Sequence, residues 1–155
     1  MRGHEYLLGL IPEFPEIKIV WRPCEAHPRP ESHGPHSDLM IMGMFCAVEA
    51  GADILAYHKL MYDAVHKDKI DIERAAALSE YAAPLLDAVK FKEALENRVY
   101  AAELDAANDH AYEKSGVWYI PAFRMNGKKL DSVGGSGVTA ADLAAFMRDA
   151  SRGRE

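Results

Sequence analysis

Apolar positions recur at steps of three and four residues through most of the chain, which is the spacing of helices with one buried face. The first such stretch, residues 4–11, should stop at Pro12, which has no backbone N–H. A long central region, residues 38–115, opens with Asp38 as a candidate cap for an almost entirely apolar helix that ends at Gly51. The pattern therefore predicts a helix-rich protein.

Three further stretches show helical spacing. The predicted helices run from Ile54 to about Lys67, from Ile72 to Ala82, and, as one or two helices, from Phe91 to Ser115 before Gly116. A last helix should start near Thr139, because Thr139 and Asp142 have the spacing of a capping box.

Strand signals are few. The run from Ile17 to Trp21 is β-branched and aromatic, and it predicts a strand covered on both faces. A second run, Ala122 to Met125, leads into Asn126-Gly127, which predicts a hairpin with a type I′ turn. Pro121 lacks an N–H and should mark the beginning, edge or bulge of that strand. Residues 24–37 are rich in proline and histidine and predict a loop.

Composition limits the classes of function. A chain of 155 residues with 49% apolar and 27% charged residues is long enough for one soluble domain, residues 1–155. Its net charge of −6 argues against a nucleic-acid partner. The apolar run near the N-terminus is broken by Pro12, too short for a signal sequence or a membrane span. We therefore expect a cytoplasmic protein without a membrane partner.

Three stretches together resemble a known family: WRPCEAHP, AYHKLMYDAVHKDKIDI and SGVWYIPAFRMNGKKL. They are similar to the DsbA-like oxidoreductases, the hydroxychromene-carboxylate isomerases and the kappa-class glutathione transferases, and they span almost the whole chain. The resemblance implies an α/β protein with a single thioredoxin-like domain, in which residues 38–115 form an inserted helical subdomain. It also implies that Pro121 follows a cis bond and that the backbone of Ile120 is free to bind an extended substrate. Trp118 and Tyr119, just before this pair, either line a substrate groove or pack over the sheet, and Trp118 is counted with Ile120 and Pro121 as a candidate substrate-binding residue.

The resemblance also identifies an absence. Redox members begin with a strand that leads into C-x-x-C, where the helix start keeps a thiolate populated. This chain has no C-x-x-C, and residues 2–10 resemble the helix that follows that motif. A truncated gene product, a misplaced start codon and a protein that has lost the chemistry all fit. We therefore expect no disulfide exchange from this chain and no cofactor, so whether it is an enzyme stays open.

Two function classes remain after this comparison. The chain is either a DsbA-like oxidoreductase that lacks its N-terminal strand and cysteine pair, or a non-catalytic module. Such a module would bind a peptide, a glutathione-like thiol or a partner subunit at Ile120-Pro121.

The remaining reactive side chains give weaker signals. Cys24 directly follows the predicted strand near Arg22 and His27, and it is the one candidate nucleophile, although a packed thiol is the commoner role. Cys46 lies in an apolar helical run and is expected to be buried. Three histidines share the proline-rich loop, namely His27, His33 and His36. Because no partner ligand at metal-site spacing joins them, we expect no metal site.

The missing strand also predicts a partner. In the thioredoxin arrangement that strand lies between the two predicted strands, so both would keep unpaired N–H and C=O groups. A second chain is the simplest source of hydrogen-bond partners for these groups. We therefore expect a homodimer that pairs strand edges or exchanges the N-terminal helix.

Overall fold

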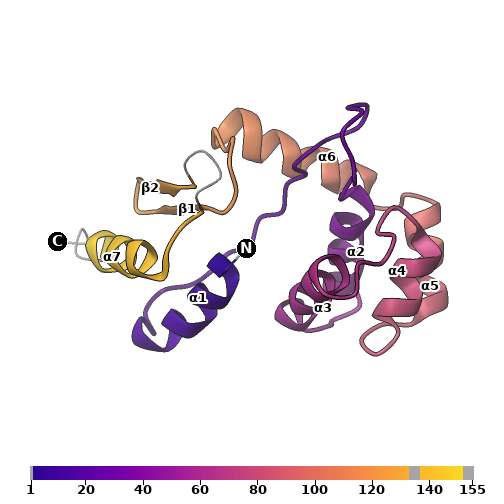
Figure 1. Cartoon of the computed structure of the whole chain (residues 1–155), viewed down its shortest axis with the longest axis horizontal. Coiled ribbons are helices and arrows are strands. Elements are labelled where there is room, and N and C mark those ends of the chain that lie inside the picture. The colour runs from indigo at the N-terminus through magenta and orange to yellow at the C-terminus, as the bar shows by residue number, and fades with distance from the viewer. Residues whose placement is uncertain (1, 133–136, 152–155) are drawn as a thin grey trace. The chain divides into compact units, whose positions relative to one another are not determined.

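The computed structural model describes residues 2–132 and 137–151, with the side chains of residues 2–5 left out (Figure 1). The chain divides into two compact units: one is Met1–Trp21 with Ser115–Glu155, and the other is Arg22–Lys114. The second unit contains nearly all of the region 38–115, for which an inserted helical subdomain was expected.

The described residues form seven helices and one antiparallel pair of strands. The helices are α1 (Arg2–Leu10), α2 (Asp38–Glu49), α3 (Ile54–His66), α4 (Ala75–Ala82), α5 (Ala88–Glu96), α6 (Ala101–Asp109) and α7 (Ala140–Ser151). A 3-10 turn at Ile11–Glu13 follows α1, and a π-helical turn at His110–Lys114 follows α6. The strands are β1 (Ala122–Met125) and β2 (Lys128–Asp131).

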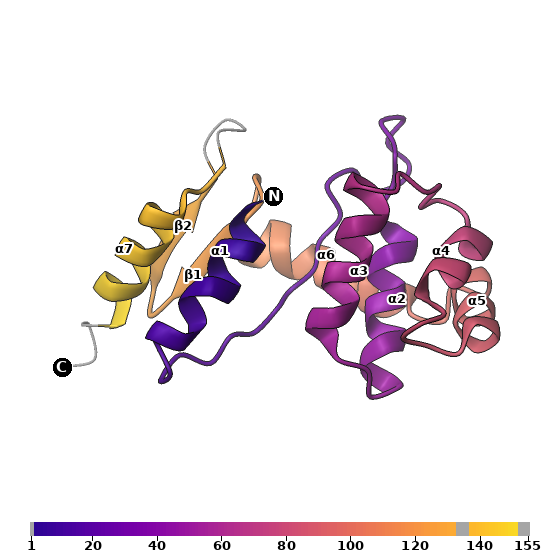
Figure 2. The same cartoon turned by 60° about the horizontal axis from the view of Figure 1, so that its bottom comes forward.

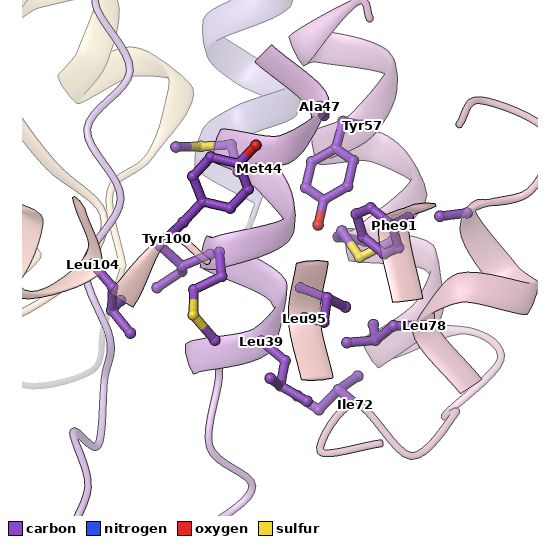
Figure 3. Packing of buried hydrophobic residues seen from close by; sticks show 14 residues of the cluster. Leu39, Met44, Ala47, Tyr57, Ile72, Leu78, Phe91, Leu95, Tyr100 and Leu104 are labelled. Atoms are coloured by element: carbon purple, nitrogen blue, oxygen red, sulfur yellow. The ribbon is translucent and has the colours of Figure 1, made fainter. Parts of the chain in front are cut away.

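In the unit Arg22–Lys114, helix α2 is the centre of the packing and contacts α3, α5 and α6 (Figure 1). Its almost entirely apolar sequence is covered by these neighbours over most of its length, as the sequence pattern indicated, although Val48 near its end is exposed. Gly43 of α2 faces the rings of Tyr57 and Phe91, which meet edge to face with their centres 6.3 Å apart (Figure 3). The Tyr57 hydroxyl is buried and donates a hydrogen bond to the carbonyl oxygen of Met40 at 2.8 Å. The absence of a side chain at Gly43 therefore allows α2 to pack closely against both α3 and α5.

Local side-chain bonds define several helix ends. Asp53 accepts a hydrogen bond from Leu55 N at the start of α3, and Asp87 accepts from Val89 N at the start of α5. The expected cap at Asp38 is wrong, because Asp38 is the first helical residue of α2 and its carboxylate binds arginines instead.

In the other unit, α1, α7 and the hairpin enclose a smaller core (Figure 2). The buried residues of this core are Leu7, Phe14, Val138, Leu143 and Met147. The start of α7 confirms the predicted capping box: Thr139 N donates to the Asp142 carboxylate, and Asp142 N donates to the Thr139 hydroxyl at 3.1 Å.

The hairpin also confirms its prediction. Asn126 and Gly127 have φ angles of 49° and 76°, the two positive values that a type I′ turn requires. The turn pairs Met125 with Lys128 and Phe123 with Leu130. The Ile120–Pro121 bond that leads into β1 is cis, as the resemblance implied.

The prediction of a strand from Ile17 to Trp21 is wrong. The segment is half-buried at Ile17, Ile19 and Trp21 and exposed at Lys18 and Val20, so it alternates as a strand would. Within the residues described here, however, Lys18, Ile19 and Val20 make no backbone hydrogen bond, so no ladder forms. Residues 17–21 thus have the side-chain pattern of a strand, while residues 18–20 have no backbone partner among the residues that the structure describes.

The sheet is therefore smaller than an α/β architecture requires. Within the described ranges it consists of β1 and β2 alone, and no thioredoxin sheet is present. The expectation of a helix-rich chain is confirmed, and the expected α/β architecture with a thioredoxin-like sheet is not found among the described residues.

The close contact at Gly43 gives a stability prediction. A Cβ atom added there would stand 2.6 Å from Phe91 Cζ, so Gly43→Ala should lower the free energy of unfolding by about 1–3 kcal/mol. Gly9→Ala is the matched control, because nothing lies within 4 Å of its added Cβ in α1, and it should raise stability by about 0.5–1 kcal/mol. Urea unfolding followed by circular dichroism would compare them. Equal stability of the two variants would contradict this account of the core.

Candidate functional site

The segment just before β1 exposes three consecutive large side chains. Trp118 is 71% exposed, Tyr119 57% and Ile120 58%. Each would bury substantial apolar area if a partner covered it. The segment belongs to the unit that contains the hairpin, whereas Cys24 belongs to the other unit. The predicted substrate-binding residues Trp118, Ile120 and Pro121 thus form one continuous stretch.

This stretch continues into a strand with one open edge. The carbonyl of Pro121 accepts a hydrogen bond from Ser132 N at 3.1 Å, and Phe123 pairs with Leu130. Because bonded residues alternate along an antiparallel strand, the N–H and C=O groups of Ala122 and Arg124 point away from β2. No backbone group of the described residues pairs with these four groups. Both outward pairs of N–H and C=O groups on β1 are therefore without a backbone partner in the described part of the chain.

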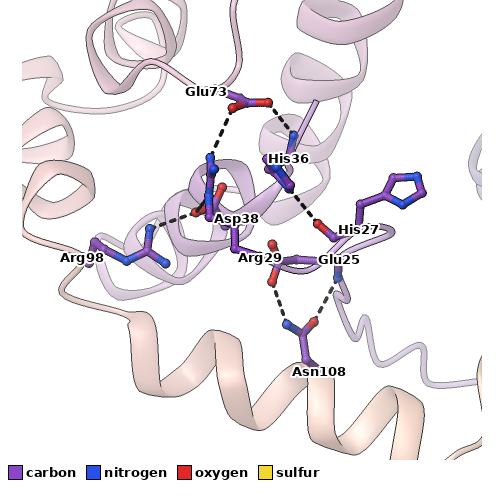
Figure 4. Close-up of polar contacts among 8 residues, drawn as sticks. All are labelled: Glu25, His27, Arg29, His36, Asp38, Glu73, Arg98 and Asn108. Atoms are coloured by element: carbon purple, nitrogen blue, oxygen red, sulfur yellow. Dashed lines mark hydrogen bonds and ion pairs between the residues drawn. The ribbon is translucent and has the colours of Figure 1, made fainter. Parts of the chain in front are cut away.

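A cluster of charged and polar residues lies in the unit Arg22–Lys114 (Figure 4). At its centre the side chain of Asp38 is only 2% exposed, and its Oδ2 atom accepts from Arg98 Nη1 at 2.8 Å and Arg29 Nε at 3.2 Å. Glu73 accepts from His36 N at 2.8 Å and from Arg29 Nη2 at 3.2 Å. Arg29 therefore links two carboxylates from different segments.

Glu25 and Asn108 extend the cluster to α6. Glu25 N donates to Asn108 Oδ1 at 3.0 Å, and Asn108 Nδ2 donates to Glu25 Oε2 at 2.7 Å (Figure 4). The second oxygens of Glu25 and Asp38 are buried and accept no hydrogen bond from any described residue. These contacts attach the proline-rich loop to α2, α6 and the segment before α4.

The carboxyl groups of the cluster differ in their acidity. Burial raises the pKa of Glu25, which the hydrogen bond from Asn108 only partly offsets. Burial also acts on Asp38, but hydrogen bonds from Arg98 and Arg29 outweigh it and hold the pKa of that carboxyl below its usual value. The backbone N–H of His36 lowers the pKa of Glu73. The charges of Asp38 and Glu73 are thus satisfied by partners within the fold.

Sequence reasoning missed this cluster. Its contacts join residues 9 to 83 positions apart, and none of them shows a helical or strand period. The only local signal was Asp38 before an apolar run, which indicates a cap just as well.

Neither thiol is activated. Burial, and then the charge of Glu25, raises the pKa of Cys24, and burial raises the pKa of Cys46. A raised pKa leaves less thiolate at neutral pH, and thiolate is the reactive form.

Two of the loop histidines have neighbouring rings, and the third contacts the backbone of the loop. The rings of His27 and His33 have their centres 6.0 Å apart, and the buried ring of His36 contacts the carbonyl oxygen of His27 at 2.9 Å. Residues 2–132 and 137–151 contain no group of three or more His, Cys, Asp or Glu side chains placed to hold a metal ion. Among the helices of the same residues, none has the length and apolar content to cross a membrane.

A cavity of about 480 Å³ lies beside the start of α4. Leu39 and Leu95 form part of its wall, and Glu73 and Arg98 line it while bound to the polar cluster. None of the residues singled out in the sequence as site residues lines this cavity.

The opposite pKa shifts of Glu25 and Glu73 predict opposite pH effects. Glu25 has a raised folded pKa, so its ionisation lowers stability as pH rises through that pKa, and Glu25→Gln should raise the free energy of unfolding at pH 7. Glu73 has a lowered pKa, so its stabilising effect is present at pH 7 and is lost on acidification; Glu73→Gln should lower stability at pH 7. Urea unfolding at pH 7 and at pH 4 would test this. Both differences should shrink at pH 4, and the same sign for both variants at pH 7 would contradict the assignment.

The state of the thiols predicts their reactivity. Both cysteines should react with iodoacetamide at pH 7 more slowly than free cysteine, because their thiolate populations are smaller. The chain should also give no turnover in insulin reduction. Turnover that disappears in Cys24→Ser would identify Cys24 as a nucleophile and refute this prediction.

Comparison of the chain with models of known protein families, with curated proteins and with solved structures finds no match.

Proposed function

We propose that the chain is a non-redox binding module of DsbA-like, thioredoxin-related ancestry that holds an extended peptide against Trp118–Pro121. The observation that carries this proposal is the exposure of Trp118, Tyr119 and Ile120 in direct succession. Three neighbouring large apolar side chains that face solvent are typical of a surface that a partner covers. Aromatic residues of this kind contribute much of the binding energy at peptide and protein interfaces.

The position of the segment favours an extended ligand. The residues directly precede β1, whose outer N–H and C=O groups lack backbone partners among the described residues. A peptide in the same conformation can add its own main-chain hydrogen bonds to such an edge while its side chains contact the exposed residues.

The alternative, thiol-disulfide exchange, has less support. It needs a populated thiolate, whereas the pKa of each cysteine is raised by burial. Peptide binding requires neither thiol.

Tryptophan fluorescence offers a direct test, because the chain has only Trp21 and Trp118. The Trp21→Phe variant leaves Trp118 as the reporter. Reduced and carbamidomethylated insulin B chain serves as the probe peptide, since it is extended, apolar and unable to form disulfides. Titration should give a saturable blue shift of Trp118 emission. Absence of any saturable change would contradict the proposal.

Two variants locate the binding surface. Ile120→Asp should weaken binding about tenfold or more, because it places a charge within the apolar contact. Val48→Asp is the matched control: Val48 is 57% exposed on α2, close to the 58% of Ile120. Equal weakening by both substitutions would show that the peptide binds without using the segment before β1.

A further inference from the structure

The open edge of β1 has a pattern that identifies its partner. Ala122 and Arg124 present their N–H and C=O groups outward, and no backbone group of the described residues binds them. We infer that β1 of one chain pairs with β1 of a second copy, antiparallel and across a two-fold axis at Phe123. The result is a four-stranded sheet in the order β2, β1, β1, β2.

Strand parity selects this register. Antiparallel strands exchange two hydrogen bonds only between residues that both face the shared edge. With the axis at Phe123, Ala122 of each copy pairs with Arg124 of the other, which uses all eight outward groups of the two strands. An axis at Arg124 would place like charges opposite each other. An axis at Ala122 would pair Arg124 with Ile120, which lies before β1 and outside the strand.

The apolar face of the hairpin agrees with this register. Phe123 and Leu130 are cross-strand partners, and both pack against the core of their unit. In the paired sheet the two Phe123 side chains are direct neighbours, each flanked by its own Leu130. Neighbouring aromatic side chains stabilise antiparallel pairs. One continuous apolar row therefore crosses the interface.

The charged face is complementary as well. In each chain Asp131 lies opposite Ala122, and the Arg124 guanidinium forms an ion pair with the Asp131 carboxylate. Pairing at Phe123 places Arg124 of the second copy on the other side of Ala122. Only a methyl group then separates that arginine from Asp131 of the first copy, and the axis repeats the arrangement. Each copy thus offers one cation and one carboxylate to the other.

The dimer would use the same outer edge of β1 to which the proposed peptide adds its main-chain hydrogen bonds, so the two exclude each other on one chain. The dimer does not need Trp118 or Ile120, however, and it is measured by mass, whereas peptide binding is measured by Trp118 emission. The two ideas can therefore fail independently. An unaltered chain that binds the peptide but never dimerises would overturn the interface alone, and one that dimerises but binds no peptide even when dilute and monomeric would overturn the peptide site alone.

Charge reversal in the full chain tests the interface. Arg124→Asp alone places a second carboxylate near Asp131 of the other copy, and Asp131→Arg alone places two guanidinium groups together. Each variant should raise the dimer dissociation constant about tenfold or more, because juxtaposed like charges oppose association. An equimolar mixture of the two variants should restore dimerisation, since both rows then join opposite charges. Sedimentation velocity or light scattering after size exclusion would measure the masses.

Each substitution also breaks the ion pair between Arg124 and Asp131 within its own hairpin, and mixing the two variants cannot restore that pair. Recovery of the dimer in the mixture therefore assigns the effect to the interface between the chains. Asp149→Arg is the control for charge: Asp149 pairs with Lys128 away from the β1 edge, and this variant should dimerise as the unaltered chain does. A monomeric unaltered chain throughout the micromolar range would overturn the inference. Undiminished dimerisation of both Arg124→Asp and Asp131→Arg would also overturn the inference, because another surface would then hold the dimer together.

Amide hydrogen exchange tests the same pairing in the unaltered chain, so its result does not depend on whether a substituted chain folds. The amides of Ala122 and Arg124 should exchange more slowly at concentrations where the dimer forms than under dilution. Exchange of these two amides that is independent of concentration in a dimeric sample would overturn the proposed pairing.

Discussion

Every backbone N–H and C=O group needs a hydrogen-bond partner, and this requirement determines how the unit that contains the hairpin can be completed. The inner edge of β1 meets this need through β2, and the type I′ turn at Asn126-Gly127 sets which residues pair. The outer edge finds no backbone partner among the described residues, and neither do Lys18, Ile19 and Val20. The helices α1 and α7 cover the apolar face but cannot bond to a strand edge. The proposed dimer follows from this unmet requirement, and the proposed peptide, which rests first on the exposed side chains before β1, would use the same edge.

Features set by neighbouring residues could be predicted from the sequence. The hairpin turn and the capping box of Thr139 and Asp142 each lie within four positions, so their geometry depends on local chemistry alone. The caps Asp53 and Asp87 obey the same rule and could have been identified by it. The exposed position of Trp118 could not be predicted in this way, because a large apolar side chain before a strand packs inward as readily as it faces solvent.

Features that join distant residues could not be predicted in this way. The segment Ile17–Trp21 has strand composition, but a strand exists only if another segment supplies its ladder. Asp38 looks like a cap, yet two arginines from other parts of the fold take its carboxylate. Of the predicted site residues, the structure places Trp118, Ile120 and Pro121 in one stretch beside an open edge. Burial and the charge of Glu25 raise the pKa of Cys24, which disfavours the thiolate.

An edge that can accept one strand can also begin an aggregate, and the hairpin carries the side chains that limit this. Each strand is only four residues long, and Arg124 places a charge at the β1 edge; short strands and charged side chains both limit edge-to-edge association. On the far side, β2 presents Lys129 and Asp131 along its outer edge. Pairing at β1 would therefore leave only short, charged edges exposed. Such an assembly is closed at two chains and resists growth into fibres.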